Sequence, residues 1–423
     1  MTDFILGGGV SGLAAGMASG FTVLEAAETP GGICASYYLR SAGAPRLAEA
    51  PRDQEAFRFE LGGGHWIFGA DAKVRRLLND LCPLVTYRRK ATAFFPARQL
   101  HVPYPIQDHA EQLGAGFARR LREETARAEH EVRTLREWLQ MSFGPTLCGE
   151  FFFPFHELYT AGLYHRIAPQ DAYKSPRASG PGAGYNAEFA YPANGLDGLI
   201  REMAKRCRIR YASTVVAIDP RARMLRLGDG SELAYARLIS TLPLDRMLAL
   251  TGIAVDAPAD PRTSVLVLNI AARRGRNCPD CHWSYLPGSA AGFHRVGFYD
   301  NVERSFLPRS RRSGKELVSL YVERAFPAGA RPDGPQCAAY AARAVAELQA
   351  WEFIGEALLV DPTWIDVAYT WSWPGSAWRS QAIAALDAVG IVQVGRYARW
   401  TFQGIAGSIG DGLAAGAAAA RSP

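Results

Sequence analysis

The first 32 residues contain the feature that most restricts how this chain can fold. A short apolar run at 4–6 leads into Gly7-Gly8-Gly9-Val10-Ser11-Gly12, which fits the pattern G-x-G-x-x-G. The first glycine permits a tight turn, the second lets the backbone approach a pyrophosphate, and the third lets a helix pack closely on a strand. A helix over 13–18 and a strand over 21–24 should follow. The sequence therefore predicts a βαβ nucleotide-binding unit.

An acidic residue ends the second predicted strand. Glu25 is placed to accept hydrogen bonds from ribose hydroxyls, and an acid there disfavours a 2′-phosphate. Glu25 follows Gly12 by only thirteen positions, whereas about twenty are usual between the fingerprint and this acid, so the first helix must be short. The segment from Glu25 to Gly31-Gly32 reads E-A-x-x-x-x-G-G, and this ending resembles FAD-binding enzymes of the amine oxidase type.

Length and composition limit the class of protein. A chain of 423 residues is too long for one simple core, and no run of about 18 apolar residues predicts a membrane span. The formal charge of +6 with scattered arginines indicates a small anionic substrate or a solvated surface rather than nucleic acid. Seven cysteines, an odd number, fit the reducing cytoplasm, and no signal peptide is expected.

One cysteine pair has the spacing of a metal-binding or redox motif. Cys278 and Cys281 form a C-x-x-C, but no second pair with zinc spacing follows and no thioredoxin-like unit surrounds it. We interpret the pair as structural and expect no metal site. The oligomeric state stays open.

Patterning along the chain predicts an α/β fold in which a Rossmann-like FAD-binding domain is interleaved with a mixed α+β substrate domain. We expect a discontinuous FAD-binding domain over 1–100, 187–250 and 385–423, a helical insertion or lid over 101–186, and a substrate-binding sheet over 251–384. Within these ranges we expect a polar loop at 40–56, exposed charged helix at 107–140, a loop or lid at 174–186, strands at 208–218, 264–271, 296–299, 317–323 and 390–394, and a last helix from about Gly410.

Five further segments resemble one family, the UDP-galactopyranose mutases and the broader set of mutase-like, protoporphyrinogen-oxidase-like flavoproteins. They are Gly62-Gly63-Gly64-His65-Trp66-Ile67-Phe68, Val102-Pro103-Tyr104-Pro105-Ile106-Gln107, Tyr185-Asn186-Ala187-Glu188-Phe189-Ala190-Tyr191-Pro192, Leu238-Ile239-Ser240-Thr241-Leu242-Pro243 and Val394-Gly395-Arg396-Tyr397-Ala398-Arg399-Trp400. The segments occur in the family's order over nearly the whole chain.

The resemblance implies non-covalent FAD of the GR2/amine-oxidase type, active in its reduced form, with NAD(P)H as a candidate reductant. The residues assigned to the cofactor are Gly7, Gly9, Ser11, Gly12, Glu25, Gly31, Gly32, Gly64, Arg396 and Asp411. It also implies that His65 lies near the flavin N5, unless this histidine only completes a turn.

Substrate residues follow from the same resemblance. Arg166 and Arg295 match arginines that bind the substrate pyrophosphate, a role suited to a guanidinium because it pairs two oxygens at once; the alternative is a surface or structural arginine. Tyr104, Trp283 and Tyr285 match substrate-site aromatics, although aromatic residues at strand spacing also fill cores.

The resemblance is weaker near the C-terminus. Where the mutases carry a tyrosine and an asparagine on the substrate pyrophosphate, this chain has Phe402, still assigned to the substrate site, and Ala406. Asp108-His109 replaces an asparagine pair.

Two functions follow. The first is redox-neutral pyranose/furanose isomerisation of a nucleotide sugar through the reduced-flavin N5, which fits a chain without a recognisable nucleophile motif. The alternative is an FAD-dependent oxidase or desaturase, which the changes at Phe402 and Ala406 favour.

Overall fold

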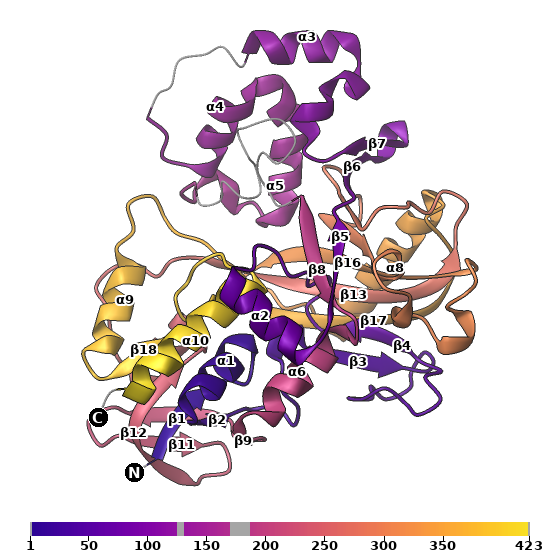
Figure 1. The fold of residues 1–423 in the computed structure, drawn as a ribbon. Helices are drawn as coiled ribbons and strands as arrows, with labels where there is room; N and C mark the ends of the chain where they lie inside the picture. Colours follow the sequence, from indigo (N-terminus) through magenta and orange to yellow (C-terminus); the bar gives the residue numbers. More distant parts are fainter. Residues whose placement is uncertain (1, 125–130, 170–186, 422–423) are drawn as a thin grey trace.

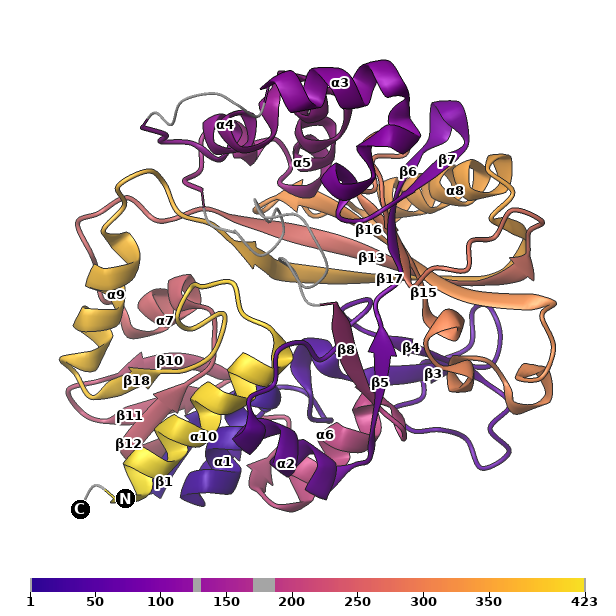
Figure 2. The ribbon, with the colours of Figure 1, turned by 45° about the horizontal axis from the view of Figure 1, so that its top comes forward.

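Two seven-stranded sheets organise the chain. The computed structural model describes residues 2–124, 131–169 and 187–421. Figures 1 and 2 show the first sheet at one end of the molecule, the second sheet in the middle and a group of helices at the opposite end. The mixed α/β fold predicted from the sequence is confirmed.

The first sheet, which we call the nucleotide sheet, has β1 (Thr2–Leu6) near its centre. β1 pairs in parallel with β2 (Thr22–Leu24) on one side and β12 (Glu232–Ser240) on the other. Its side chains alternate between two apolar clusters, with Phe4 and Leu6 in one and Ile5 in the other, as expected of a parallel strand buried on both faces. Two more parallel strands and an antiparallel pair complete the sheet: β9 (Arg208–Arg210), β18 (Ile391–Gln393), β10 (Val215–Asp219) and β11 (Met224–Leu227).

Two helices, α1 (Val10–Ser19) and α10 (Ile405–Arg421), lie against each other on this sheet (Figure 1). α1 has only ten residues, in keeping with the short spacing before Glu25. α10 begins at Ile405, five residues before the predicted Gly410, and its first two residues, Ile405 and Ala406, are buried in the core. A Cβ atom on Gly412 would collide with the backbone oxygen of Ser11. Glycine is therefore required for the two helices to touch.

We expect Gly412→Ala to lower the free energy of unfolding by about 1–3 kcal/mol, because an added methyl group forces two packed helices apart. Gly410→Ala is the matched control on the same helix, since its Cβ would meet only Val74 Cγ2 at 3.6 Å. Chemical denaturation of both variants measures the difference. Equal stabilities would contradict the proposed close packing.

The second sheet is largely antiparallel and carries one helix on one of its faces. Its strands, in spatial order, are β17 (Ile354–Thr370), β13 (Arg262–Arg274), β16 (Leu317–Pro327), β15 (Arg295–Phe298), β14 (Trp283–Tyr285), β6 (Ala91–Phe95) and β7 (Leu100–Pro103). Along β13, Leu266 and Leu268 pack in the cluster beneath α8 (Gly334–Ala350), whereas Val265 and Val267 join the main core. This alternation follows from the period of two in a strand.

Two strands of the second sheet, β6 and β7, come from the part of the chain before residue 104. β6 pairs in parallel with β14 of the second sheet, although residues 91–95 fall in the range 1–100 proposed for the FAD-binding domain. The proposed domain ranges stay predictions.

The helical group comprises α3 (Ala115–Glu124), α4 (Leu135–Leu147), a π-helical turn at Cys148–Phe152 and α5 (Phe153–Tyr159). It lies at the far end from the nucleotide sheet (Figures 1 and 2). The predicted loop or lid at 174–186, which includes Tyr185 and Asn186, lies outside the described residues.

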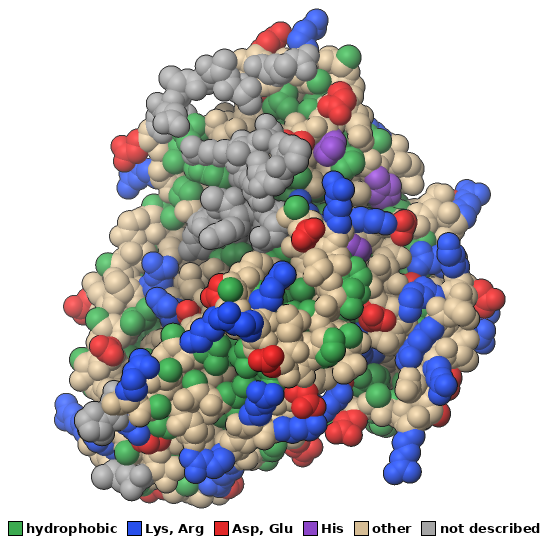
Figure 3. Space-filling view, viewed as in Figure 1, with side chains coloured by type: hydrophobic (Ala, Val, Ile, Leu, Met, Phe, Trp, Pro, Cys, Tyr) green, Lys and Arg blue, Asp and Glu red, His purple; other side chains and the backbone are tan. Residues whose placement is uncertain are grey.

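The remaining elements connect these parts. They are β3 (Ser36–Leu39), β4 (Phe57–Glu60), β5 (Leu84–Arg88), β8 (Glu188–Pro192), α2 (Ala72–Leu81), α6 (Gly195–Lys205), α7 (Leu244–Thr251), α9 (Trp378–Asp387) and 3-10 turns at Gly32–Cys34, Pro96–Arg98, Ile106–Leu113, Leu163–His165, Tyr299–Asn301, Arg304–Phe306 and Arg309–Arg311. Among the described residues, none of the helices combines the length and apolar character needed to cross a bilayer. On the face in Figure 3, basic side chains are interspersed with acidic ones over several elements.

Candidate functional site

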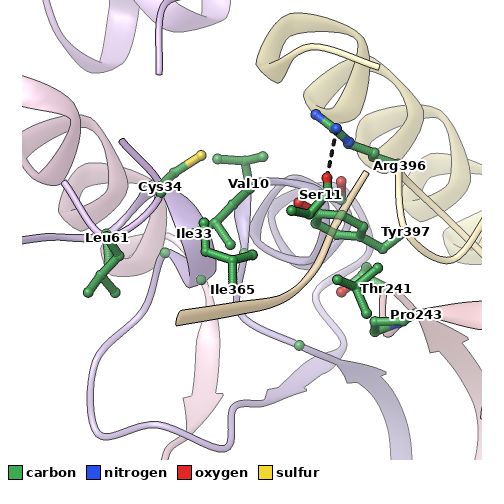
Figure 4. Close-up of a pocket in the computed structure, with 18 of the residues that line it drawn as sticks. Val10, Ser11, Ile33, Cys34, Leu61, Thr241, Pro243, Ile365, Arg396 and Tyr397 are labelled. Atoms are coloured by element: carbon green, nitrogen blue, oxygen red, sulfur yellow. Dashed lines mark hydrogen bonds between the residues drawn. The ribbon is translucent and has the colours of Figure 1, made fainter. Parts of the chain in front are cut away.

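A cavity of about 980 Å³, here called the central cavity, lies where the nucleotide sheet meets the second sheet. Small-ligand sites span roughly 300–1,000 Å³, so this one is at the upper end of the range. The predicted site residues that line it are Gly7, Gly9, Ser11, Glu25, Gly31, Gly32, Gly64, His65, Trp283, Arg295, Arg396 and Phe402. In Figure 4, Ile33, Cys34 and Leu61 lie on one side of it, opposite Thr241, Pro243, Arg396 and Tyr397.

The glycine cluster forms an open cradle at the start of α1. Gly9 is the N-cap of α1, and no side chain caps that end. The first backbone N–H groups of the helix therefore remain available for an anion. A Cβ on Gly9 would meet only Gly31 O at 4.0 Å and so would point into the central cavity, whereas one on Gly12 would collide with Gly7 O. Gly9 thus gives access to a ligand, and Gly12 permits close packing.

Glu25 holds the glycine turn in place with two hydrogen bonds. Its Oε2 accepts a hydrogen bond from the Gly8 N–H at 2.6 Å, and its Oε1 accepts one from the Ala27 N–H at 2.8 Å. The carboxylate therefore fixes the glycine turn while also lining the cavity. Its contact with a ribose stays a prediction.

The turn at Gly395 brings the C-terminal segment against the same cradle. Gly395 has φ +84°, and a Cβ on it would collide with Ser11 Oγ, so a larger residue is excluded there. Arg396 donates to Ala368 O at 2.9 Å and its guanidinium lies 5.0 Å from the Phe402 ring centre. Asp411 does not line the cavity but accepts a hydrogen bond at 3.0 Å from Gln403, which does.

The loop that ends in His65 lies close to the second sheet. Cβ atoms on Gly64 and Gly297 would both overlap the Tyr321 side chain, so these glycines let the loop pack on β16. His65 Nδ1 lies 3.1 Å from Gly63 O, and since a carbonyl only accepts, Nδ1 carries the proton of that bond. Burial lowers the pKa of His65 to about 4. The imidazole is therefore neutral near pH 7, with Nε2 as an acceptor.

Arg295 has a partner that the sequence reasoning missed. Its Nε and Nη2 donate to Glu323, with Nη2 at 2.5 and 2.6 Å from the two carboxylate oxygens. Burial alone would raise the pKa of Glu323, but the charge of Arg295 and the hydrogen bonds from Arg295 and His294 lower it to about 2. Both residues line the central cavity as a fixed ion pair. The residues stand opposite each other on β15 and β16.

Three predicted substrate residues lie away from the lining. Arg166 is exposed, with its guanidinium 5.1 Å from the Trp373 ring centre. Tyr104 and Tyr285 are buried and pack on each other with ring centres 4.8 Å apart. In the described structure these two tyrosines serve the core, and their contact with substrate stays a prediction.

The thiols are poor candidates for nucleophiles. Cys34 lines the central cavity, and burial raises the pKa of its thiol to about 12. Cys278 accepts a hydrogen bond from Arg274, and Cys281 lies beside Ser284. Over the described residues, no group of three His, Cys, Asp or Glu side chains could hold a metal ion.

Comparison with known proteins agrees with the geometry. The model of the family described as "Flavin containing amine oxidoreductase" matches residues 13–272. The fold is similar to that of reduced UDP-galactopyranose mutase, with a TM-score of 0.80 and 18% identity over 98% of this chain and 95% of that one.

Two other solved structures share the fold more distantly. A redesigned putrescine oxidase gives a TM-score of 0.60 with 15% identity, covering 99% of this chain and 98% of that one. A CLA-producing fatty acid isomerase from P. acnes gives 0.59 with 12% identity, covering 98% and 97%. At these identities the likeness describes the fold and not the reaction.

Proposed function

We propose a specific reaction for this chain, which belongs to the flavin containing amine oxidoreductase family and is an FAD-dependent enzyme. The reaction is the redox-neutral pyranose/furanose isomerisation of a nucleotide sugar. When bound in its reduced form, FAD would supply the nucleophilic N5 for this chemistry. The open end of α1 would hold its pyrophosphate through backbone N–H groups that no side chain caps, and Gly9 would leave room for it.

The observation that carries the proposal is the fixed guanidinium of Arg295 in the cavity wall. Its bonds to Glu323 use Nε and Nη2, so the planar group is already oriented before a ligand arrives. A preorganised arginine binds an anion without the entropic cost of ordering a long side chain. Trp283 lines the same cavity and offers an aromatic ring for a base or a sugar.

Two further features support cofactor-driven chemistry. His65 is neutral near pH 7, so it would meet a reduced, anionic flavin as a hydrogen-bonding group rather than as a cation. Cys34, which lines the cavity, stays a protonated thiol at that pH. The protein would then position the substrate and leave bond formation to the cofactor. The overall likeness to a reduced UDP-galactopyranose mutase is consistent with this reading.

A second candidate function is an FAD-dependent oxidase or desaturase. The specific observation in its favour is Phe402, which lines the central cavity beside Arg396 and offers no hydroxyl to a phosphate. Arg166, the other arginine predicted to bind the pyrophosphate, does not line the cavity in the described structure, whereas Arg246, Arg262 and Arg396 do. The apolar ring of Phe402 in the cavity wall would suit a carbocycle or an amine as substrate.

The two functions differ in their use of oxygen. We expect the enzyme, reduced by dithionite or NAD(P)H under anaerobic conditions, to convert a UDP-sugar into a product of equal mass. Mass spectrometry of a panel of UDP-sugars, with peroxide measured in parallel, provides the test. Turnover of the oxidised enzyme in air with the loss of about two mass units and the release of peroxide would replace the mutase by the oxidase.

A further inference from the structure

The loop that carries His65 is held by a carboxylate to which the sequence reasoning assigned no role. Glu60 ends β4 and is fully buried; the next residue, Leu61, is labelled in the close-up of the cavity (Figure 4). Glu60 Oε2 accepts the His65 backbone N–H at 3.2 Å, and Oε1 accepts the Tyr191 hydroxyl at 2.5 Å. The backbone carbonyl of Glu60 accepts a third hydrogen bond, from Asn269 Nδ2 at 3.0 Å. One residue thus ties the cavity loop to β8 and β13.

A buried arginine is linked to this carboxylate through a tyrosine hydroxyl. Arg58 lies two residues earlier on β4, hence on the same face of the strand. It is also buried, and its Nη2 donates to the Tyr191 hydroxyl at 3.2 Å. The Arg58 guanidinium stacks 4.0 Å from the Phe306 ring centre. The Tyr191 hydroxyl therefore bridges Arg58 and Glu60, and the charge of Arg58 also acts on the carboxylate through space.

Burial and the neighbouring groups act on the pKa of Glu60 in opposite directions. Burial raises its pKa to about 7, even though Tyr191 and Arg58 act to lower it. The titratable groups around it are Arg58 on β4, Cys34 and His65 beside the cavity, Tyr191 on β8, Asp197 on α6, Tyr299 on the 3-10 turn Tyr299–Asn301, and Tyr321 on β16. Near pH 7 Arg58 stays charged, and the thiol, the imidazole and the three phenols stay neutral.

We propose that Glu60 is a positioning residue of the flavin site, whose carboxylate holds the His65 loop against the central cavity and holds it less tightly once protonated. A carboxylate accepts an N–H more strongly than a neutral carboxyl does, so protonation weakens the bond to His65. The proton binds to Glu60 itself, and no other bond is made or broken. The proposal rests on FAD binding and not on the choice between mutase and oxidase.

The test follows the bound flavin rather than turnover. In the wild-type holoprotein, we expect the visible FAD spectrum to change with an inflection near pH 7 over a titration from about pH 5.5 to 8.5. Glu60→Gln should keep bound FAD and lose this inflection, and pH-difference infrared spectra should lose the matching protonated-carboxyl band. A wild-type spectrum without the inflection, or a Gln variant that keeps it, would overturn the proposal.

A second variant keeps the test valid if Glu60→Gln does not fold. Tyr191→Phe removes one donor to the carboxylate, so the inflection should move upward by about one pH unit. Tyr340→Phe is the matched control, because Tyr340 is equally buried in the cluster beneath α8, away from the cavity. An inflection that is unmoved in Tyr191→Phe, or moved equally in Tyr340→Phe, would also contradict the role of Glu60.

Discussion

Gly9→Val should yield a folded protein that no longer binds FAD. Gly9 has φ −74° and ψ 178°, a backbone conformation that valine adopts without strain. The nearest atom to a new Cβ is Gly31 O at 4.0 Å, so the protein itself leaves room for the side chain. That room is where the pyrophosphate would approach the helix end. We expect FAD affinity to fall at least about 100-fold, or about 2.8 kcal/mol.

The measurement is FAD content after purification and reconstitution, combined with circular dichroism and thermal unfolding of the apoprotein. Gly12→Ala is the contrasting variant, because its Cβ would collide with Gly7 O and should destabilise the fold itself. If Gly9→Val bound FAD like the wild type, the cofactor phosphates would have to lie elsewhere. The phosphate cradle proposed here would then be wrong.

The fold and the glycine cluster at the cavity could be predicted because their signals are local in the sequence. A G-x-G-x-x-G turn has few backbone solutions, and the structure places Gly7, Gly9 and Glu25 together at one cavity. The turn at Gly395 belongs to the same class, since its positive φ and its contact with Ser11 both require glycine.

The partners of these residues could not be predicted, because they depend on pairing between distant strands. Glu323 reaches Arg295 only through the register of β15 against β16, and no spacing along the chain encodes that register. Glu60 had a signal in retrospect, as a carboxylate placed within the buried strand Phe57–Glu60 just before a glycine run. Buried carboxylates need partners, and this rule could have singled it out.

The substrate end was the hardest to predict, because aromatic and basic side chains have several uses. Tyr104 and Tyr285 have the residue types of a sugar site, yet in this structure they pack on each other. Arg166 has the charge that a diphosphate needs but is exposed and lies against Trp373. Residue type alone does not say whether a side chain faces a cavity, the core or solvent.

Arg295→Ala should produce the largest combined loss of stability and activity among the cavity variants. It removes the proposed anion-binding guanidinium, which should cost about 2–4 kcal/mol of transition-state binding and raise the Michaelis constant. It also leaves Glu323, whose side chain is only 2% exposed, without its main cation. Breaking a buried pair in this way costs about 3–5 kcal/mol of folding stability.

The pH dependence of unfolding separates these two effects. In the wild type the pKa of Glu323 is lowered to about 2, so its stabilising contribution is complete above the unfolded value near 4.5 and is lost as the pH falls toward 2. In Arg295→Ala burial dominates and should raise that pKa above the unfolded value. The variant's deficit in unfolding free energy should then shrink as the pH falls from 7 to about 5, because protonation relieves the unpaired charge.

The double variant Arg295→Ala with Glu323→Gln should recover stability at pH 7 but not substrate binding, because only the buried charge is removed. Recovery of both would reduce Arg295 to a purely structural role, whereas a deficit independent of pH would show that Glu323 does not depend on Arg295.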